Sequence, residues 1–196
     1  MDNSHLESKL ELRRHFLRQI KEPLRVMDCF QGDGVIWNHL KSEFELESYW
    51  GLDLEIKKGR LKIDSSRVLS QPGWSENVID LDAYGSPWKH YIAMLPNIRD
   101  WVVVFLTFSI GKLVFSIDQI QLDMLGVSHL NIPPGIKNKL TKYAVSHCLT
   151  KSYDFCIIPI EVKEAIPFGN CRYIGLRLER IKQNGRFDNC VDGKHF

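Results

Sequence analysis

Apolar and polar positions alternate along the chain with two periods, one typical of helices and the other of strands. Residues 5–21 carry apolar side chains at helical spacing, and Pro23 ends this helix. Two further helices are predicted at 35–46 and around 87–95. Short apolar runs predict five strands, at 24–30, 48–55, 60–66, 77–82 and 101–110.

The order of these elements predicts an α/β fold. Strands separated by helices or helix-length segments pair in parallel through right-handed crossovers, with helices on both faces of the sheet. Residues 155–181 differ, because two strands joined by a short loop at 167–170 predict an antiparallel hairpin. We therefore expect a mostly parallel sheet closed by a reversed edge strand.

The segment between the fifth strand and the hairpin has a different composition. Residues 118–135 are expected to be rich in loops, and 136–149 to be helical. The chain carries no internal repeat or interdomain linker. We expect an N-terminal helix within 1–22 that packs on a single domain spanning 23–196.

Composition excludes several classes of protein. The 196 residues are 44% hydrophobic and 26% charged, as in ordinary globular domains, and the formal charge of +2 leaves only local basic surfaces. The apolar run 101–106 is too short to cross a membrane, and the N-terminus lacks the apolar core of a signal peptide. Five cysteines without a CxxC pair predict reduced thiols and no metal site. We expect a cytoplasmic protein.

The sequence DCFQGDG, residues 28–34, lies at a predicted junction between strand and helix. Gly32 and Gly34 allow a sharp turn and the close approach of a ligand, and the helix that follows offers unpaired N–H groups. A glycine turn after a strand is also common for structural reasons alone, without a ligand. The motif has two glycines where a dinucleotide fingerprint has three.

Acidic residues end the predicted strands that follow. Asp53 either accepts the hydroxyls of a ribose or caps a helix, and Asp64 either accepts from an adenine amino group or caps the turn after it. Asp80 and Asp82 share one face of the fourth strand, while Leu81 points to the other. Ligands of open α/β sheets bind at these carboxyl ends, so the four acids predict a binding crevice.

These residues resemble the class I S-adenosylmethionine-dependent methyltransferases, with a Rossmann-like sheet, over about residues 24–181. DCFQGDG is similar to the first motif of that family, and Asp53 and Asp64 lie where its ribose-binding and adenine-contacting acids are found. The terminal hairpin fits the reversed strand of the family's sheet. The resemblance implies S-adenosyl-L-methionine as cofactor, bound by Asp28, Phe30, Gly32, Gly34, Asp53, Asp64 and Asp80.

Within the family, IDLDAYGSP resembles the catalytic motif of the tRNA guanine-N2 dimethyltransferases, approximately D-x-D-P-F/Y-G-S-P. The resemblance implies that Asp82 accepts a hydrogen bond from the acceptor amine and that Tyr84 stacks on the base, although this ring can instead pack over the turn. It further implies a substrate-binding role for Ser86, Pro87 and Lys89. Ala83 replaces the proline that stiffens this loop, and we see no counterpart of the C-terminal domain that those enzymes use to hold tRNA.

Basic residues form three local groups that either contact phosphates or are solvated helix faces. These are Lys89 with His90, then Lys137, Lys139 and Lys142, and finally Arg13, Arg14 and Arg18. The sequence favours an N-methyltransferase acting on a nucleobase, in RNA rather than DNA, without a membrane partner. The alternatives are a non-catalytic S-adenosylmethionine-binding module and a methyltransferase for a protein or a small molecule.

Overall fold

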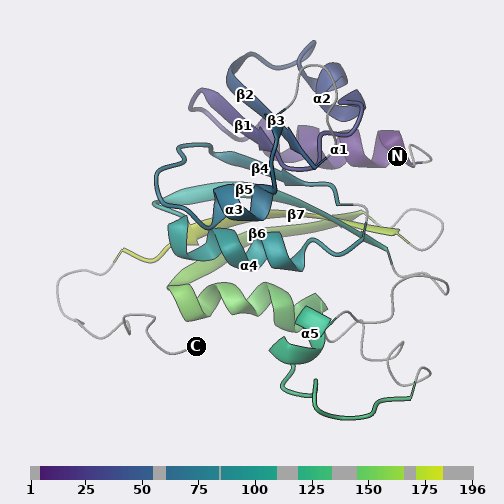
Figure 1. The fold of residues 1–196 in the computed structure, drawn as a ribbon. Coiled ribbons are helices and arrows are strands. Elements are labelled where there is room, and N and C mark those ends of the chain that lie inside the picture. The colour runs from purple at the N-terminus through teal and green to yellow at the C-terminus, as the bar shows by residue number, and fades with distance from the viewer. Residues whose placement is uncertain are drawn as a thin grey trace.

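The computed structural model describes residues 5–54, 61–83, 85–109, 119–133, 145–165 and 171–182. Its centre is a seven-stranded sheet in the order β3-β2-β1-β4-β5-β7-β6 (Figure 1). The strands are β1 (Leu24–Asp28), β2 (Leu46–Asp53), β3 (Leu61–Lys62), β4 (Val78–Leu81), β5 (Trp101–Ser109), β6 (Ile157–Ala165) and β7 (Cys171–Arg180).

Pairing within the sheet matches the predicted fold class. Strands β1 to β5 are paired in parallel, and β7 is antiparallel to both β5 and β6. The reversed strand is therefore β7, and the edge strand is β6, whereas the sequence led us to expect the reversed strand at the edge. Because the chain begins a new half of the sheet at β4, the order reverses between β1 and β4, which is where ligands of such sheets bind.

Helices cover both faces of the sheet (Figure 1). They are α1 (Leu6–Leu17), α2 (Val35–Leu40), α3 (Ser65–Leu69), α4 (Trp88–Met94) and α5 (Gln119–Met124), with short 3-10 turns at Leu95–Asn97 and Lys151–Phe155. Residues 145–150 are also helical. Neither α3 nor α5 was predicted, because five or six residues are too few to display a helical period.

Two apolar cores result from the alternation of side chains along the strands. One lies between the sheet and α4, where Trp88, Tyr91 and Met94 pack on Ile79 and Leu81. The other lies between the opposite face and the helices α1 and α2, where Phe16 and Trp37 are buried. Asp28, Asp80 and Asp82 have the parity of Val26 and Val78, so these three acids point toward the second core, under α1.

The sequence predicted only some of the residues that α1 buries against the sheet. Leu10 and Phe16 are buried as expected, but Lys9 and Arg13 are also buried, with 5% and 1% of their surface exposed. The sequence suggested that Arg13 either contacts phosphates or lies on a solvated face, and the structure contradicts both alternatives. Its guanidinium instead enters the core beside the acids of β4.

Predicted strand boundaries were accurate to two residues except in the third strand, predicted at 60–66, because β3 ends at Lys62 and α3 begins at Ser65. The first helix, predicted to reach residue 21, ends at Leu17. The first strand ends at Asp28, two residues before its predicted end, because the chain turns there into the glycine loop. The second predicted helix, 35–46, is shorter than expected and ends at Leu40, since β2 already begins at Leu46. Within the described residues, none of the helices is long and apolar enough to span a membrane.

Candidate functional site

The loop between β1 and α2 depends on two glycines with a left-handed backbone. Gly32 has φ 54° and Gly34 has φ 69°, a region that side chains with a Cβ rarely adopt. The Gly34 amide donates to the Gln31 carbonyl at 2.7 Å, and Gly34 is the residue that precedes α2. The loop therefore passes from β1 into the first turn of α2 within a few residues, as the sequence predicts.

Asp53 lies at the end of β2 and touches this loop. Its Oδ2 accepts a hydrogen bond from the amide of Gly32 at 3.0 Å. The Gln31 amide donates to the Leu52 carbonyl at 3.1 Å, so the loop is attached to the end of β2 at two points. Two residues predicted to bind the cofactor, Gly32 and Asp53, are thus brought into contact.

Asp64 caps the short helix α3. Its carboxylate accepts from the amide and the hydroxyl of Ser66, at 2.9 and 2.7 Å, and from Lys89 Nζ at 3.1 Å. The hydrogen bonds from Ser66, together with Lys89, lower the pKa of Asp64 to about 2. Of the two interpretations offered by the sequence, the capping role is present in the structure. Adenine contact remains a prediction.

Asp28 is the first of three buried acids. The Tyr49 hydroxyl donates to its Oδ2 at 2.8 Å, and the Phe30 amide lies 3.4 Å from its Oδ1. Asp28 is paired with Asp80 in the register of β1 and β4, so the two carboxylates are close neighbours. Burial, and then the charge of Asp80, raise the pKa of Asp28 well above its usual value.

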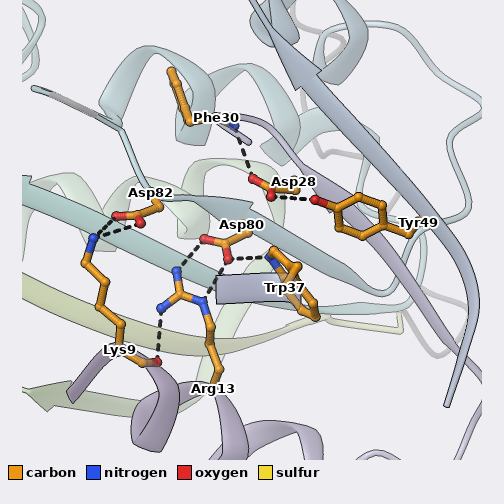
Figure 2. Close-up of polar contacts among 8 residues, drawn as sticks. All are labelled: Lys9, Arg13, Asp28, Phe30, Trp37, Tyr49, Asp80 and Asp82. Carbon is orange, nitrogen blue, oxygen red and sulfur yellow. Dashed lines mark hydrogen bonds and ion pairs between the residues drawn. The ribbon is translucent and has the colours of Figure 1, made fainter. Parts of the chain in front are cut away.

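Asp80 is held by three donors. Arg13 donates from Nε to Oδ2 at 2.8 Å and from Nη2 to Oδ1 at 2.6 Å, which is a bidentate pair. The indole Nε1 of Trp37 donates to Oδ2 at 2.8 Å. Figure 2 shows Arg13 and Trp37 approaching this carboxylate from α1 and α2. In the structure, the partners of the Asp80 carboxylate are Arg13 and Trp37, and its contact with a cofactor stays a prediction.

Asp82, the predicted acceptor-binding residue, is paired with Lys9. Lys9 Nζ lies 2.8 Å from both carboxylate oxygens, and the side chains of both residues are 6% exposed (Figure 2). Burial alone would raise the pKa of Asp82, but the charges of Arg13 and Lys9 lower it below its usual value, with help from the Thr107 hydroxyl. Asp82 is therefore an ionised hydrogen-bond acceptor.

A narrow cleft, with room for about one water molecule, connects the glycine loop with the acids of β4. It is lined by Asp28, Phe30, Gln31, Gly34, Val35, Ile36, Trp37, Asp80 and Asp82. Gln31 Oε1 is buried and has no hydrogen-bond partner within the described residues. The side-chain amide of Gln31 packs against the backbone of Gly51, since a Cβ at Gly51 would overlap it. This buried oxygen is therefore an unsatisfied acceptor next to the backbone of Gly51.

Two aromatic side chains, Phe30 and His90, are in contact beside the cleft. Phe30 meets His90 of α4 edge to face, with ring centroids 4.6 Å apart. His90 Nε2 lies 3.8 Å from Asp64 Oδ1. Burial lowers the pKa of His90 to about 4, so the ring is neutral at pH 7. The aromatic pair links the loop after β1 to the beginning of α4.

The remaining predicted residues lie on the turn that follows β4. Pro87 precedes α4, and the Ser86 hydroxyl is 3.5 Å from the Trp88 amide, so both residues help to begin that helix. Lys89 pairs with Asp64, as described above. Tyr84 lies outside the described residues, as do Lys137, Lys139 and Lys142. Their predicted roles stay predictions.

Sequence reasoning missed the two cations that hold the acids of β4. Lys9 and Arg13 lie three and seven residues after Leu6, which places them on the apolar stripe of the helix and not opposite it. That spacing was the available signal. It could not reveal the partners, because Lys9 and Asp82 are 73 residues apart in the chain. Trp37 and Tyr49 were missed for the same reason.

Comparisons with known proteins identify the fold. No family model and no curated protein matches the sequence. Among solved structures, Trm1 from Pyrococcus horikoshii with S-adenosyl-L-methionine has a TM-score of 0.62 at 14% identity, covering 89% of this chain and 54% of that one. TYW2 from M. jannaschii in complex with AdoMet has a TM-score of 0.57 at 10% identity, covering 89% and 77%.

A third structure has a different kind of substrate in its name. The magnesium protoporphyrin IX methyltransferase ChlM from Synechocystis PCC 6803, with bound SAM, has a TM-score of 0.50 at 13% identity, covering 90% of this chain and 80% of that one. At such identities the likeness establishes the fold, which is the Rossmann-like fold of the class I S-adenosylmethionine-dependent methyltransferases. The chain spans about half the length of the Trm1 chain.

Proposed function

We propose that this protein is an S-adenosylmethionine-dependent N-methyltransferase whose acceptor is an exocyclic amine of a nucleobase in RNA, such as guanine N2. The observation that carries the proposal is the cleft that has the glycine loop of β1 on one side and Asp82 of β4 on the other. It lies at the carboxyl ends of the strands, next to the reversal of strand order.

The residues around the cleft fit S-adenosyl-L-methionine. The left-handed Gly34 borders the cleft, so the backbone there can approach a ligand closely. Asp53 lies next to Gly32, where a carboxylate, which accepts several hydrogen bonds, can bind ribose hydroxyls. When bound, the cofactor supplies a methyl group on a sulfonium.

Asp82 suits the acceptor half of the reaction. The lone pair of an exocyclic amine is delocalised into its ring, and an ionised carboxylate that accepts from the N–H favours the charge that develops on nitrogen. The lowered pKa keeps Asp82 ionised at pH 7. Transfer from a sulfonium is an in-line displacement, so holding the amine in line with the methyl group is the protein's main contribution. A base within folded RNA would first have to leave its stack.

The cofactor half is tested by calorimetric titration with S-adenosylhomocysteine. We expect saturable binding by the wild-type protein and at least tenfold weaker binding by Asp53→Ala. Lys151→Ala is a matched control, because Lys151 forms an exposed ion pair with Asp154 in a 3-10 turn away from the cleft. Absence of binding to the wild type would remove the cofactor from the proposal.

The acceptor half is tested with cofactor carrying a tritiated methyl group, offered with pools of RNA, DNA and protein. We expect label in RNA. Asp82→Asn should reduce the incorporation by at least 100-fold while the affinity for S-adenosylhomocysteine changes by less than about threefold. Label in protein alone would identify a protein methyltransferase instead. Equal incorporation by wild type and Asp82→Asn would exclude Asp82 from catalysis.

A second candidate function has an observation of its own. Both oxygens of Asp82 are bound by Lys9 in a buried pair, and such pairing fits a domain that keeps a cofactor site without turnover. A non-catalytic S-adenosylmethionine-binding module predicts saturable cofactor binding and no label in any of the three pools. The same two experiments therefore separate the candidates.

A further inference from the structure

The ammonium of Lys9 lies where an acceptor amine has to bind. Its Nζ is 2.8 Å from each oxygen of Asp82, and the same ammonium lies 5.1 Å from the centroid of the Tyr173 ring. Both side chains of the ion pair are almost fully buried. Carboxylate oxygens can accept more than one hydrogen bond, but Lys9 and Asp82 are both buried, so an amine that donates to Asp82 in the geometry proposed above competes with the ammonium for the space beside these oxygens.

Movement of the whole helix is not a simple way to release Asp82. One turn after Lys9, Arg13 forms a bidentate pair with Asp80 in the core. Phe16 packs so closely on β7 that a Cβ at Gly175 would overlap its ring. The part of α1 that can move easily is the side chain of Lys9, a compact charge on a flexible stem of four carbons.

Removing the ammonium from Asp82 has a cost that the acceptor must offset. A buried charge that loses its partner is strongly unfavourable, because neither water nor a counter-ion replaces the lost interaction. An acceptor that brings an anionic group next to its amine gives the displaced ammonium a new partner. In nucleic acids every base is flanked by phosphates, which lysine side chains bind readily.

We propose that Lys9 determines acceptor specificity. The ammonium of Lys9 leaves Asp82 only when the acceptor is a nucleotide with a phosphate next to the target base, and it then binds that phosphate. This inference rests on the proposed function and adds to it the requirement that a phosphate beside the target base binds Lys9. Lys9 exchanges one anionic partner for another and undergoes no covalent change. A neutral nucleoside leaves the ammonium on Asp82 and cannot place its amine there.

The first test compares two acceptors that differ only in phosphate. Each nucleoside is offered to the wild-type protein as the neutral nucleoside and as its 3′,5′-bisphosphate, and kcat/KM is measured with labelled cofactor. We expect a preference for the bisphosphate of at least 30-fold. Lys9→Met should reduce this preference to about threefold or less, since the competitor and the phosphate ligand are removed together. Lys151→Met, the exposed control, should keep the preference of the wild type.

The second test does not need turnover, and its result is read from the wild-type protein. In protein labelled with ¹⁵N at lysine, the ammonium signal of Lys9 is assigned by its absence from Lys9→Met. We expect this signal to shift when the bisphosphate saturates the cofactor-loaded protein and to stay in place with the nucleoside. The Lys151 signal serves as the internal reference.

The outcomes separate this inference from the proposed function. A Lys9 signal that stays in place while the bisphosphate binds, or a preference that Lys9→Met leaves unchanged, overturns the role of Lys9 and leaves the methyltransferase proposal standing. A Lys9 shift specific to the bisphosphate without any methyl transfer supports the exchange of partners and contradicts catalysis. Failure of the bisphosphate to bind the cofactor-loaded protein overturns the inference.

Discussion

The acids at the carboxyl ends of the strands fall into two groups that are satisfied in different ways. Asp53, at the end of β2, and Asp64, two residues after β3, accept hydrogen bonds from nearby backbone amides and lie partly exposed. Asp80 and Asp82, on β4, are buried and bound by cations from α1, 67 and 73 residues earlier in the chain. The first group holds neighbouring loops and a short helix in place, while the second fixes α1 over the sheet.

This difference has an energetic consequence. An exposed acid that caps a turn contributes about 1 kcal/mol, and its loss is partly compensated by water. A buried carboxylate that loses its cation remains charged in an apolar core, which costs several times more. The comparison predicts that substitutions in the β4 group mainly reduce stability and that those near β2 and β3 affect stability little.

The largest effect is expected for Arg13→Met. It leaves the carboxylate of Asp80 buried without its bidentate partner and should lower the free energy of unfolding by about 3–5 kcal/mol. Urea denaturation measures the change. The double variant Arg13→Met with Asp80→Leu should recover much of the loss, because no unpaired charge remains. A loss below about 1 kcal/mol in the single variant would contradict the contrast between the two groups.

A smaller effect is expected for Tyr49→Phe, which removes only the hydroxyl that donates to Asp28. The buried Asp28 carboxyl then lacks one donor, and the free energy of unfolding should fall by about 1–2 kcal/mol. The change in urea midpoint gives this value. Since the ring volume is kept, a larger loss would mean that the hydroxyl supports more of the acid cluster than Asp28 alone.

Asp64→Ala tests the partly exposed group of acids. Removing the cap of α3 should cost about 1 kcal/mol, and Asp64→Asn should cost less, because asparagine caps helices about as well as aspartate. Thermal unfolding of the two variants measures the difference. If Asp64→Asn were as damaging as Asp64→Ala, the charge and not the cap would be the main contribution.

The smallest effect is the pH dependence of the same residue. The folded pKa of Asp64 is lowered to about 2, below the ordinary value of 3.8, so its ionised form stabilises the folded state. The stability difference between wild type and Asp64→Ala should be constant above about pH 5 and decrease as the pH falls from 4 toward 2. Urea midpoints at several pH values test this. An unchanged difference at pH 2.5 would contradict the lowered pKa.

Local patterns predicted much of the site. The glycine turn after β1, the acids that end β2 and β4, and the common face of Asp80 and Asp82 all follow from short spacings in the sequence. The ambiguity of Asp64 between cap and ligand was also visible there, because a cap is decided by the next two residues. Short spacings could not identify the partners of the buried acids, because these partners lie 67 and 73 residues away in the chain.

The sequence by itself determined the α/β fold class and, to within two residues, where most of the strands end, because alternation and turn residues act over a few positions. The tertiary structure alone decided that Lys9 and Arg13 face inward and pair with Asp82 and Asp80. A lysine or arginine on a helix has the same local pattern whether it meets water or a buried carboxylate. Only the packing of α1 on the sheet removes the water and selects the carboxylate.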